Sequence, residues 1–303
     1  MFHFLRPKKI LVTHNGKFHA DDIFACATLQ LALERQGFRT EIVRTRDAEI
    51  IKNADIVFDV GGIYDHEQGR YDHHQKGGAG EHDNGIPYAS FGLVWKHYGD
   101  VLTENSELTS LINHKLVQPV DADDNGVQLY ECVRNDIGPR TMQSIFYTFR
   151  PTWKEGSTDS VHDERFKEMV TLAKKLILRE IKVCADVCPV RDMIRSVYEG
   201  TDDPSILLLT EGYPWEPFID EYEDIIYVVY PRNGMWRVGG VPTSKGSYTL
   251  KKQLPHSWAG LRGAALCDVT GIDDAVFCHN ARFLAVAQSQ EGALRLAQLA
   301  LKA

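Results

Sequence analysis

Hydrophobic and polar positions in the first part of the chain alternate between strand-like and helix-like patterns. A helix is predicted over residues 21–36, where strong helix formers end at Gly37. Short apolar runs typical of buried strands occur at 8–13, 41–45, 55–60 and 70–74. Because a helix separates the first two strands, the order predicts a parallel α/β sheet with helices on both faces.

Helical spacing returns in the middle of the chain. Short helical patterns are found at 89–97 and 107–117, after a loop at 75–87 that is rich in Gly, Asp, Asn and His. A longer amphipathic pattern runs over residues 160–187, and its apolar stripe predicts a packing face rather than a cofactor site.

The pattern changes after Gly200 and predicts a second, smaller α+β domain. Strand-like runs are found at 205–209, 224–230, 235–241 and 275–278, before a closing helix at 291–301. The dipeptide Asn233-Gly234 between two of these runs indicates a hairpin. We therefore expect a metal-binding catalytic domain at 1–155, a helical connector at 156–200 and a substrate-binding domain at 201–303.

The composition is that of a folded protein without an extended basic surface. The 303 residues are 43% hydrophobic and 25% charged, and the net charge is −8. A structural nucleic-acid binder would show a basic stripe, whereas an enzyme that holds nucleic acid at a metal site needs none. No apolar run approaches the roughly 20 residues of a membrane span, and the six Cys lack C-x-x-C spacing. We expect a cytoplasmic protein with reduced thiols and no membrane partner.

Candidate chemistry begins where the first strand gives way to the first helix. His14, His19 and Asp21 lie in this turn, at the edge of a parallel sheet where ligands bind. Imidazoles and carboxylates placed there can converge on one cation. Asp22 fits equally well as a ligand or as a cap of the helix N-terminus, and both interpretations stay open.

Further imidazoles and carboxylates follow the later elements. Asp59 ends the apolar run DIVFDV, and Asp121 follows LVQPV. Between them, Asp72 precedes His73 and His74, whose side chains point in opposite directions on an extended segment. One of the two histidines is therefore expected to bind metal and the other to contact substrate.

Longer motifs in the same order resemble a known superfamily. The motifs around His14, Asp59, His73 and Asp121 occur in the order of the DHH phosphoesterase superfamily, which includes single-strand exonucleases, nano-RNA phosphatases and manganese pyrophosphatases. The chain is more similar still to the Myg-type family, through THNGKFHADD (13–22), DVGGIYD (59–65), RYDHHQ (70–75), VDADDNG (120–126), LPHSWAGLRG (254–263) and TGIDDAVFCH (270–279). The resemblance implies a DHH-type N-terminal domain and a metal-dependent hydrolase, with a 3′–5′ RNA exonuclease activity in eukaryotic members.

We expect two divalent cations at this site. Oxygen and imidazole ligands without thiolate favour Mn²⁺, with Mg²⁺ or Co²⁺ as alternatives. Asp59 is expected to bridge the two ions, and the remaining metal ligands are expected to be His14, His19 and Asp21 on one side and His73 and Asp121 on the other. Such a pair lowers the pKa of a water nucleophile. His74 is expected to act in catalysis beside the phosphate.

The second domain is expected to supply a cationic clamp on the substrate. Arg262, Lys252 and His279 are the candidates, because guanidinium groups in particular bind phosphate oxygens in pairs. An ordinary surface role is equally compatible with Lys252. The residues after His279 lack the Gly-rich stretch that the resemblance would lead one to expect.

Three functions remain open at this point. The first is a metal-dependent phosphodiesterase that acts as a 3′–5′ exonuclease on single-stranded RNA or short oligonucleotides. The second is a hydrolase of small phosphorylated molecules such as pyrophosphate or nucleotides, which the net charge of −8 favours. The third is a metal-binding protein without catalysis. A homodimer is also left open.

Overall fold

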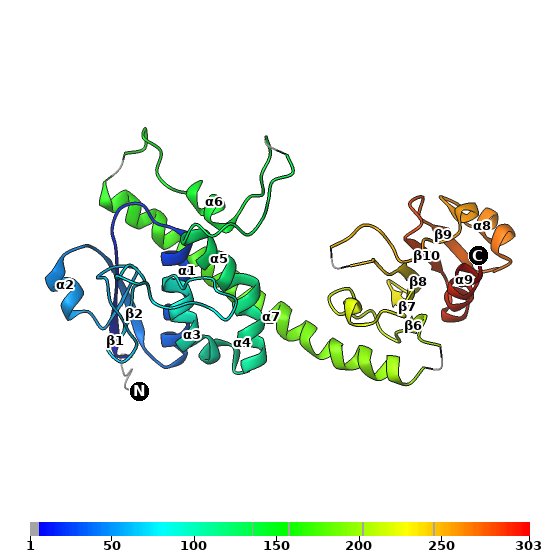
Figure 1. Ribbon diagram of the computed structural model, residues 1–303, viewed down its shortest axis with the longest axis horizontal. Coiled ribbons are helices and arrows are strands. Elements are labelled where there is room, and N and C mark those ends of the chain that lie inside the picture. Colours follow the sequence, from blue (N-terminus) through cyan, green and yellow to red (C-terminus); the bar gives the residue numbers. More distant parts are fainter. Residues whose placement is uncertain (1–5, 135, 157, 202, 245) are drawn as a thin grey trace, which may run out of the picture. The chain divides into compact units, whose positions relative to one another are not determined.

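The computed structural model describes residues 6–134, 136–156, 158–201, 203–244 and 246–303 (Figure 1). It divides into two compact units, Met1–Ala185 and Asp186–Ala303. The division falls inside the long helix α7 (Asp159–Glu199), which covers nearly the same residues as the predicted connector. The catalytic and substrate-binding roles of the two domains remain predictions.

A five-stranded sheet forms the centre of the N-terminal unit, in the order β2-β1-β3-β5-β4. Its strands are β1 (Lys8–Thr13), β2 (Arg39–Arg44), β3 (Ile56–Phe58), β4 (Tyr64–Asp65) and β5 (Arg70–Tyr71). The first three and β5 run parallel, whereas β4 pairs with β5 in the antiparallel direction. The parallel sheet predicted from the hydrophobic pattern is therefore present, with an antiparallel strand added at one edge.

Helices cover both faces of this sheet (Figure 1). On one face α1 (Ala20–Arg35) packs against α3 (Ser90–Thr103), where the rings of Phe24 and Phe91 stack 5.1 Å apart. On the other face α2 (Ala48–Asn53) places Ile51 over Val12 and Val57. Most side chains of α1 are buried, which explains why its sequence has small and apolar residues on nearly every side.

A nearly continuous helical segment follows α3. It consists of α4 (Ser106–Ile112), a π-helical turn (Asn113–Val117) and α5 (Gln118–Asp124). The sequence predicted that this helix ends near Val117, but the chain continues because Pro119 lies in the first turn of α5. Proline is tolerated there, since the N–H that it lacks would have no partner within that helix.

The C-terminal unit contains a second five-stranded sheet, in the order β6-β7-β8-β10-β9. Its strands are β6 (Ile206–Leu208), β7 (Tyr227–Arg232), β8 (Met235–Gly240), β9 (Ala275–Cys278) and β10 (Leu284–Ala287). Only β6 and β7 pair in parallel, and the other pairs are antiparallel. The predicted hairpin is confirmed: Asn233 and Gly234 join β7 to β8 with φ of 55° and 73°.

Helices and loops pack on both faces of the second sheet. Residues of α8 (Ala264–Thr270) and α9 (Gln290–Lys302) contribute to one core, and residues near the end of α7 contribute to the other. The protein is thus a mixed α/β structure with two five-stranded sheets. Among the described residues, no helix combines the length and the apolar character needed to cross a membrane.

Candidate metal centre

Polar residues follow the carboxyl ends of three neighbouring parallel strands. His14 follows β1, Asp59 follows β3, and Asp72 follows β5. Because β3 pairs in parallel with both β1 and β5, these three positions meet at one edge of the sheet. This is the edge where open α/β sheets bind their ligands. The fold therefore gathers side chains that are far apart in the sequence.

Asp59 has a backbone conformation that few residues other than glycine adopt. Its φ is 53°, and its side chain is buried. Asp tolerates this left-handed region better than most residues, and such positions cluster at functional sites. Gly62, also at positive φ, donates its backbone N–H to Asp72 Oδ2 at 2.6 Å. The turn after β3 therefore holds the end of β5 next to Asp59.

The N-terminus of α1 supplies further donors. The Nε2 atom of His14 lies 3.0 Å from Asp22 Oδ2 and 3.1 Å from Asp59 Oδ2. Asp22 Oδ1 accepts the backbone N–H of His19 at 2.9 Å. Asp22 thus has both of the contacts that the sequence left open, because one oxygen caps the helix and the other faces His14.

Asp21 is fully buried and connects α1 to α3. Its carboxylate accepts the backbone N–H of Ser90 at 3.1 Å and of Phe91 at 2.6 Å, which have no partner within the first turn of α3. Burial, followed by the nearby charges of Asp124 and Asp59, raises the pKa of Asp21 well above its ordinary value. A carboxylate under this strain would be stabilised by a cation.

His73 and His74 point in different directions, as the sequence predicted for one extended segment. The His73 side chain is buried, with Nε2 3.3 Å from Asp124 Oδ2 and 3.6 Å from Asp59 Oδ1. The His74 side chain is 61% exposed, and its Nδ1 donates to Asp72 Oδ1 at 2.7 Å. Both oxygens of Asp72 are therefore occupied by hydrogen bonds, from Gly62 and from His74.

The structure does not bring Asp121 together with the other predicted ligands. Asp121 is fully buried, where Oδ2 bonds His82 Nε2 at 2.7 Å and Oδ1 accepts the Gly92 N–H at 3.0 Å. Asp124, one turn further along α5, lies next to His73 instead. The physical reason is that the helical segment continues past Val117, so helix geometry decides which of the aspartates faces the sheet edge.

Three groups of side chains have the geometry to hold metal ions. Within each group one donor atom per residue lies within 4.8 Å of all the others. The groups are His14, His19, Asp22 and Asp59; Asp59, Asp72, His73 and His74; and Asp21, His73 and Asp124. Five of the six predicted ligands are included, and Asp59 belongs to two of the groups.

Buried donor atoms without hydrogen-bond partners face one another at this centre. They are His14 Nε2, Asp22 Oδ2, Asp59 Oδ1 and His73 Nε2. Buried polar atoms are almost always satisfied, and an unmodelled water or ion is the usual explanation for exceptions. Because the donors are carboxylate oxygens and imidazole nitrogens, the residues present fit a hard or borderline divalent cation.

The electrostatics of the centre favour added positive charge. Burial opposes ionisation of Asp59, but hydrogen bonds from His14 and His73 outweigh it and hold its pKa well below the ordinary value. Burial lowers the pKa of His14, but Asp22 and Asp59 raise it to about 10. For His73 the same balance, with Asp124 and Asp59, gives about 11. Protons on the histidines thus neutralise the carboxylates where a cation would do the same.

The centre opens into a cavity of about 610 Å³. Predicted ligands such as His14 and Asp59 line it, and so do two exposed cations that sequence reasoning missed, Lys17 and Arg46. Two signals pointed to them. Lys17 lies inside the motif THNGKFHADD, and Arg46 comes two residues after β2, which ends at the same sheet edge as β1.

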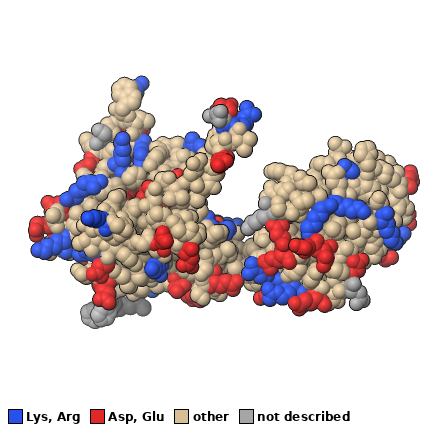
Figure 2. All heavy atoms as spheres, in the orientation of Figure 1, with Lys and Arg blue, Asp and Glu red and all other residues tan. Residues whose placement is uncertain are grey.

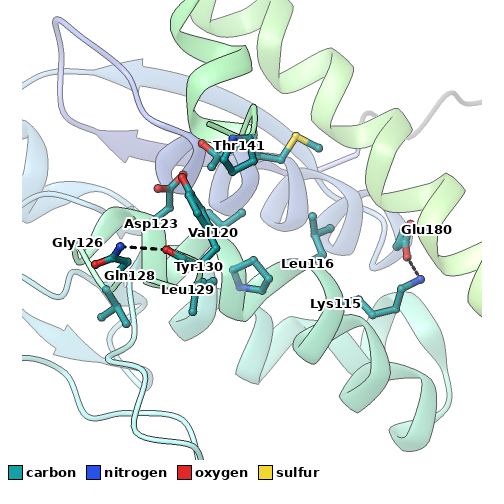
Figure 3. A pocket seen from close by; sticks show the side chains of 14 residues that line it. Lys115, Leu116, Val120, Asp123, Gly126, Gln128, Leu129, Tyr130, Thr141 and Glu180 are labelled. Carbon is teal, nitrogen blue, oxygen red and sulfur yellow. Dashed lines mark hydrogen bonds and ion pairs between the residues drawn. The ribbon is translucent and has the colours of Figure 1, made fainter. Parts of the chain in front are cut away.

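A second cavity, of about 680 Å³, lies elsewhere in the N-terminal unit (Figure 3). Its lining is largely apolar and includes Leu116, Val120, Leu129 and Tyr130. Asp123 lines this cavity, whereas none of the committed catalytic, metal or substrate-binding residues does. The larger cavity is therefore separate from the gathered donors, and α5 contributes residues to both places.

The predicted substrate-binding residues of the C-terminal unit have different surroundings. The guanidinium of Arg262 lies 4.3 Å from the ring centroid of Phe277, and the ring of His279 lies 4.3 Å from that of Phe283. Lys252 instead donates from Nζ to the carbonyl oxygen of Leu301 at 2.7 Å, in the last turn of α9. On the face shown in Figure 2, this unit carries a line of Lys and Arg beside a group of Asp and Glu.

Comparison with known proteins gives a family for the whole chain. The family model MYG1_exonuc, described as an uncharacterised protein family (UPF0160), matches residues 10–301. The chain belongs to the MYG1 family. The match extends over both units, so the metal centre and the C-terminal sheet are both parts of the family's sequence pattern. The broader placement in the DHH superfamily remains a prediction.

Individual MYG1 relatives are similar along nearly their whole lengths. A MYG1 protein of Caenorhabditis elegans is 33% identical, with 97% of this chain and 95% of the relative covered. The MYG1 exonuclease of Bos taurus is 32% identical, with 99% and 86% covered. The MYG1 exonuclease of Homo sapiens is also 32% identical, with 95% and 85% covered.

Proposed function

We propose that this chain is a metal-dependent phosphodiesterase that acts as a 3′–5′ exonuclease on single-stranded RNA or short oligonucleotides. The observation that carries the proposal is the set of buried carboxylate and imidazole atoms that face one another without hydrogen-bond partners. The name exonuclease, carried by the bovine and human relatives, supports nucleic acid as the substrate.

Two divalent cations fit the donor groups better than one. We assign one set of ligands to His14, His19, Asp22 and Asp59, and the other to Asp59, Asp21, His73 and Asp124. Asp59 is the shared ligand because it lies against both His14 and His73. Mn²⁺ is the ion that we propose, since it accepts oxygen and imidazole ligands. Bound there, the ions would lower the pKa of a water molecule and neutralise phosphate charge.

His74 is the proposed proton donor to the leaving oxygen. Its Nδ1 donates to Asp72, which fixes the tautomer and orients the ring, so Nε2 is left for the substrate. The side chain lines the cavity of the metal centre and is largely exposed, as contact with a substrate requires. Asp72 acts through His74 and is a positioning residue, because both of its oxygens are already engaged.

Cationic side chains would hold the phosphates of the substrate. Lys17 and Arg46 line the cavity and are exposed. Arg262 and His279 of the C-terminal unit are retained as proposed substrate contacts. Lys252 is not retained, because its ammonium group is already bonded to the end of α9.

A hydrolase of small phosphorylated molecules is the second candidate. A cavity of about 610 Å³ has the size of small-molecule sites. The net charge of −8 also disfavours long polyanions at a distance from the metal centre. Pyrophosphate and nucleotides are therefore included in the test.

The deciding experiment measures manganese-dependent hydrolysis of 5′-labelled single-stranded RNA, pyrophosphate and a chromogenic phosphodiester. Stepwise shortening of the RNA from its 3′ end, lost in Asp59→Asn, is the expected result. The matched control is Asp123→Asn, because Asp123 lies beside Asp124 but lines the other cavity. Turnover of the small compounds alone would establish the second candidate. Stoichiometric metal without turnover would indicate a binding protein.

A further inference from the structure

One segment beside the metal centre has aromatic and cationic side chains that the chemistry described above does not use. It is residues 147–154, YTFRPTWK, directly after α6 (Met142–Tyr147). Tyr147 is 39% exposed, Phe149 41% and Trp153 85%. Arg150 and Lys154 lie among these aromatics, each with its charged group over a neighbouring ring.

The start of this segment is attached to the same stretch of chain that carries the metal ligands of α1. Phe146 is fully buried, with its ring 5.4 Å from that of Phe24. Gln143 Oε1 accepts the backbone N–H of Ala20 at 2.6 Å. Arg150 donates from Nε to the carbonyl oxygen of Phe18 at 2.7 Å. These contacts lie on both sides of His19 in the sequence, so the segment is held against the N-terminus of α1.

Tyr147 is the aromatic residue nearest to the candidate ligands in this segment. Its ring centroid lies 6.3 Å from that of His19, at an interplanar angle of 58°. The guanidinium carbon of Arg150 lies 3.5 Å from the Tyr147 ring centroid. Because Arg150 is itself bonded to Phe18, this cation–π contact restrains the tyrosine ring while part of it stays exposed.

Exposed aromatics interspersed with cations are the arrangement by which proteins bind single-stranded nucleic acid. Each base can stack on an aromatic ring whatever its identity, and the cations contact the backbone phosphates. A free phosphate or pyrophosphate has no planar ring and would make no use of the segment. The position of Tyr147 beside His19 suits the base of a nucleotide whose phosphate is at the metal centre.

We propose that residues 147–154 form a nucleobase-stacking surface, with Tyr147 under the nucleotide at the metal centre and Trp153 under a neighbouring one. The inference rests on the proposed function and specifies its substrate: a single strand with bases, recognised without regard to sequence. The segment makes the site selective for oligonucleotides over inorganic phosphates.

Binding measured without turnover tests this surface separately from catalysis. Fluorescently labelled single-stranded RNA is titrated with protein in EDTA, and an abasic oligonucleotide of equal length is titrated in parallel. Tyr147→Ala should weaken binding of the RNA about 10-fold and leave binding of the abasic strand unchanged. Tyr147→Phe should retain wild-type affinity. The matched control is Tyr130→Ala, because Tyr130 is similarly exposed but lines the other cavity (Figure 3).

Tryptophan fluorescence gives a second measurement. Three of the five tryptophans, Trp95, Trp215 and Trp258, are buried, whereas Trp153 is 85% exposed. RNA should quench the wild-type emission, the abasic strand should not, and Trp153→Phe should lose most of the quenching. Equal weakening of both strands in Tyr147→Ala, or no weakening of either, would overturn the inference. RNA shortening that persists in that case would leave the proposed function intact.

Discussion

The N-terminal and C-terminal sheets have the same number of strands but different strand directions. In the first, β1, β3 and β5 are parallel neighbours, so the residues after them meet at one edge. In the second, β7, β8, β10 and β9 alternate in direction, so successive strands end at opposite edges. The described part of the C-terminal unit has no group of three metal-ligating side chains. Strand direction therefore decides where multivalent polar sites can form.

The second sheet offers contacts of another kind. Its last two strands and their turn carry Phe277, His279 and Phe283, with Arg262 over the first of these rings. Planar and cationic groups of this type can bind phosphates and bases but do not make a metal site. The comparison thus assigns cation binding to the N-terminal unit and leaves substrate contacts to the C-terminal unit.

The largest expected effect separates the two buried aspartates of α5. Asp124→Asn should lower the rate of RNA hydrolysis more than about 100-fold, since loss of an outer-shell partner alone costs about 10–100-fold. The metal-free variant should unfold at nearly the wild-type temperature. Asp121→Ala should instead lower the free energy of unfolding by about 3–5 kcal/mol, because it leaves His82 and Gly92 without an acceptor in a buried site.

Manganese titration calorimetry and urea denaturation of the metal-free variants measure these two properties. Loss of metal in Asp121→Ala at native stability, with metal retained in Asp124→Asn, would reverse the assignment and restore the ligand set expected from the sequence.

A smaller effect compares two glycines that lie over carboxylates, one in each unit. A Cβ on Gly92 would lie 1.8 Å from Asp121 Oδ2, and a Cβ on Gly292 would lie 2.0 Å from Asp274 Oδ1. Asp121 is fully buried and cannot move away, whereas Asp274 is partly exposed. Gly92→Ala should therefore cost about 1–3 kcal/mol in stability and Gly292→Ala less. Thermal unfolding of both variants checks the order, and the opposite order would contradict it.

The next prediction tests the roles of two cations in the C-terminal unit. Arg262→Ala should raise the KM for RNA about 10-fold, because a hydrogen bond to a charged group contributes about 1.5–3 kcal/mol. Lys252→Met should leave KM unchanged and lower stability by about 0.3–1 kcal/mol, the contribution of a cation at a helix C-terminus. Steady-state kinetics and thermal unfolding distinguish the two, and a raised KM in Lys252→Met would return that residue to the substrate site.

The smallest effect concerns a pair of histidines beside the antiparallel edge of the first sheet. The rings of His66 and His97 stack 3.6 Å apart, and burial together with the charge of His66 lowers the pKa of His97 to about 4. The unfolded chain, with a pKa of about 6.5 at this residue, then binds more protons than the folded one between these values. Stability should fall as the pH drops from about 6.5 to about 4.

His97→Gln should make this pH dependence shallower. The melting temperatures of wild type and variant, measured from pH 4 to pH 7, give the comparison. Parallel curves would mean that His97 has the same pKa in the folded and unfolded states.

Local signals in the sequence were sufficient for the strand ends. Polar residues directly after apolar runs marked His14 and Asp59, and a dyad pattern separated His73 from His74. The structure brings these four residues together as expected. They could be found because strand direction and side-chain alternation depend on neighbouring residues alone.

The choice among the aspartates of VDADDNG could not be made in the same way. A π-helical turn at Asn113–Val117 precedes α5, and one extra residue in a turn changes the direction of every side chain after it. Asp121 therefore lies under α3, Asp124 faces His73, and Asp123 lines the other cavity. The exposed segment at 147–154 was interpreted only as a boundary, because its position beside His19 depends on contacts with α1.

The sequence by itself determined the two α/β units, the hairpin at Asn233-Gly234 and the kinds of donor atoms at the first sheet edge. Only the tertiary structure decided which aspartates face those donors, which cations line their cavity and which aromatic rings lie beside them. The physical reason is range. Strands, turns and caps follow from residues a few positions apart, whereas the convergence of side chains depends on helix phase and packing between elements that are distant in the chain.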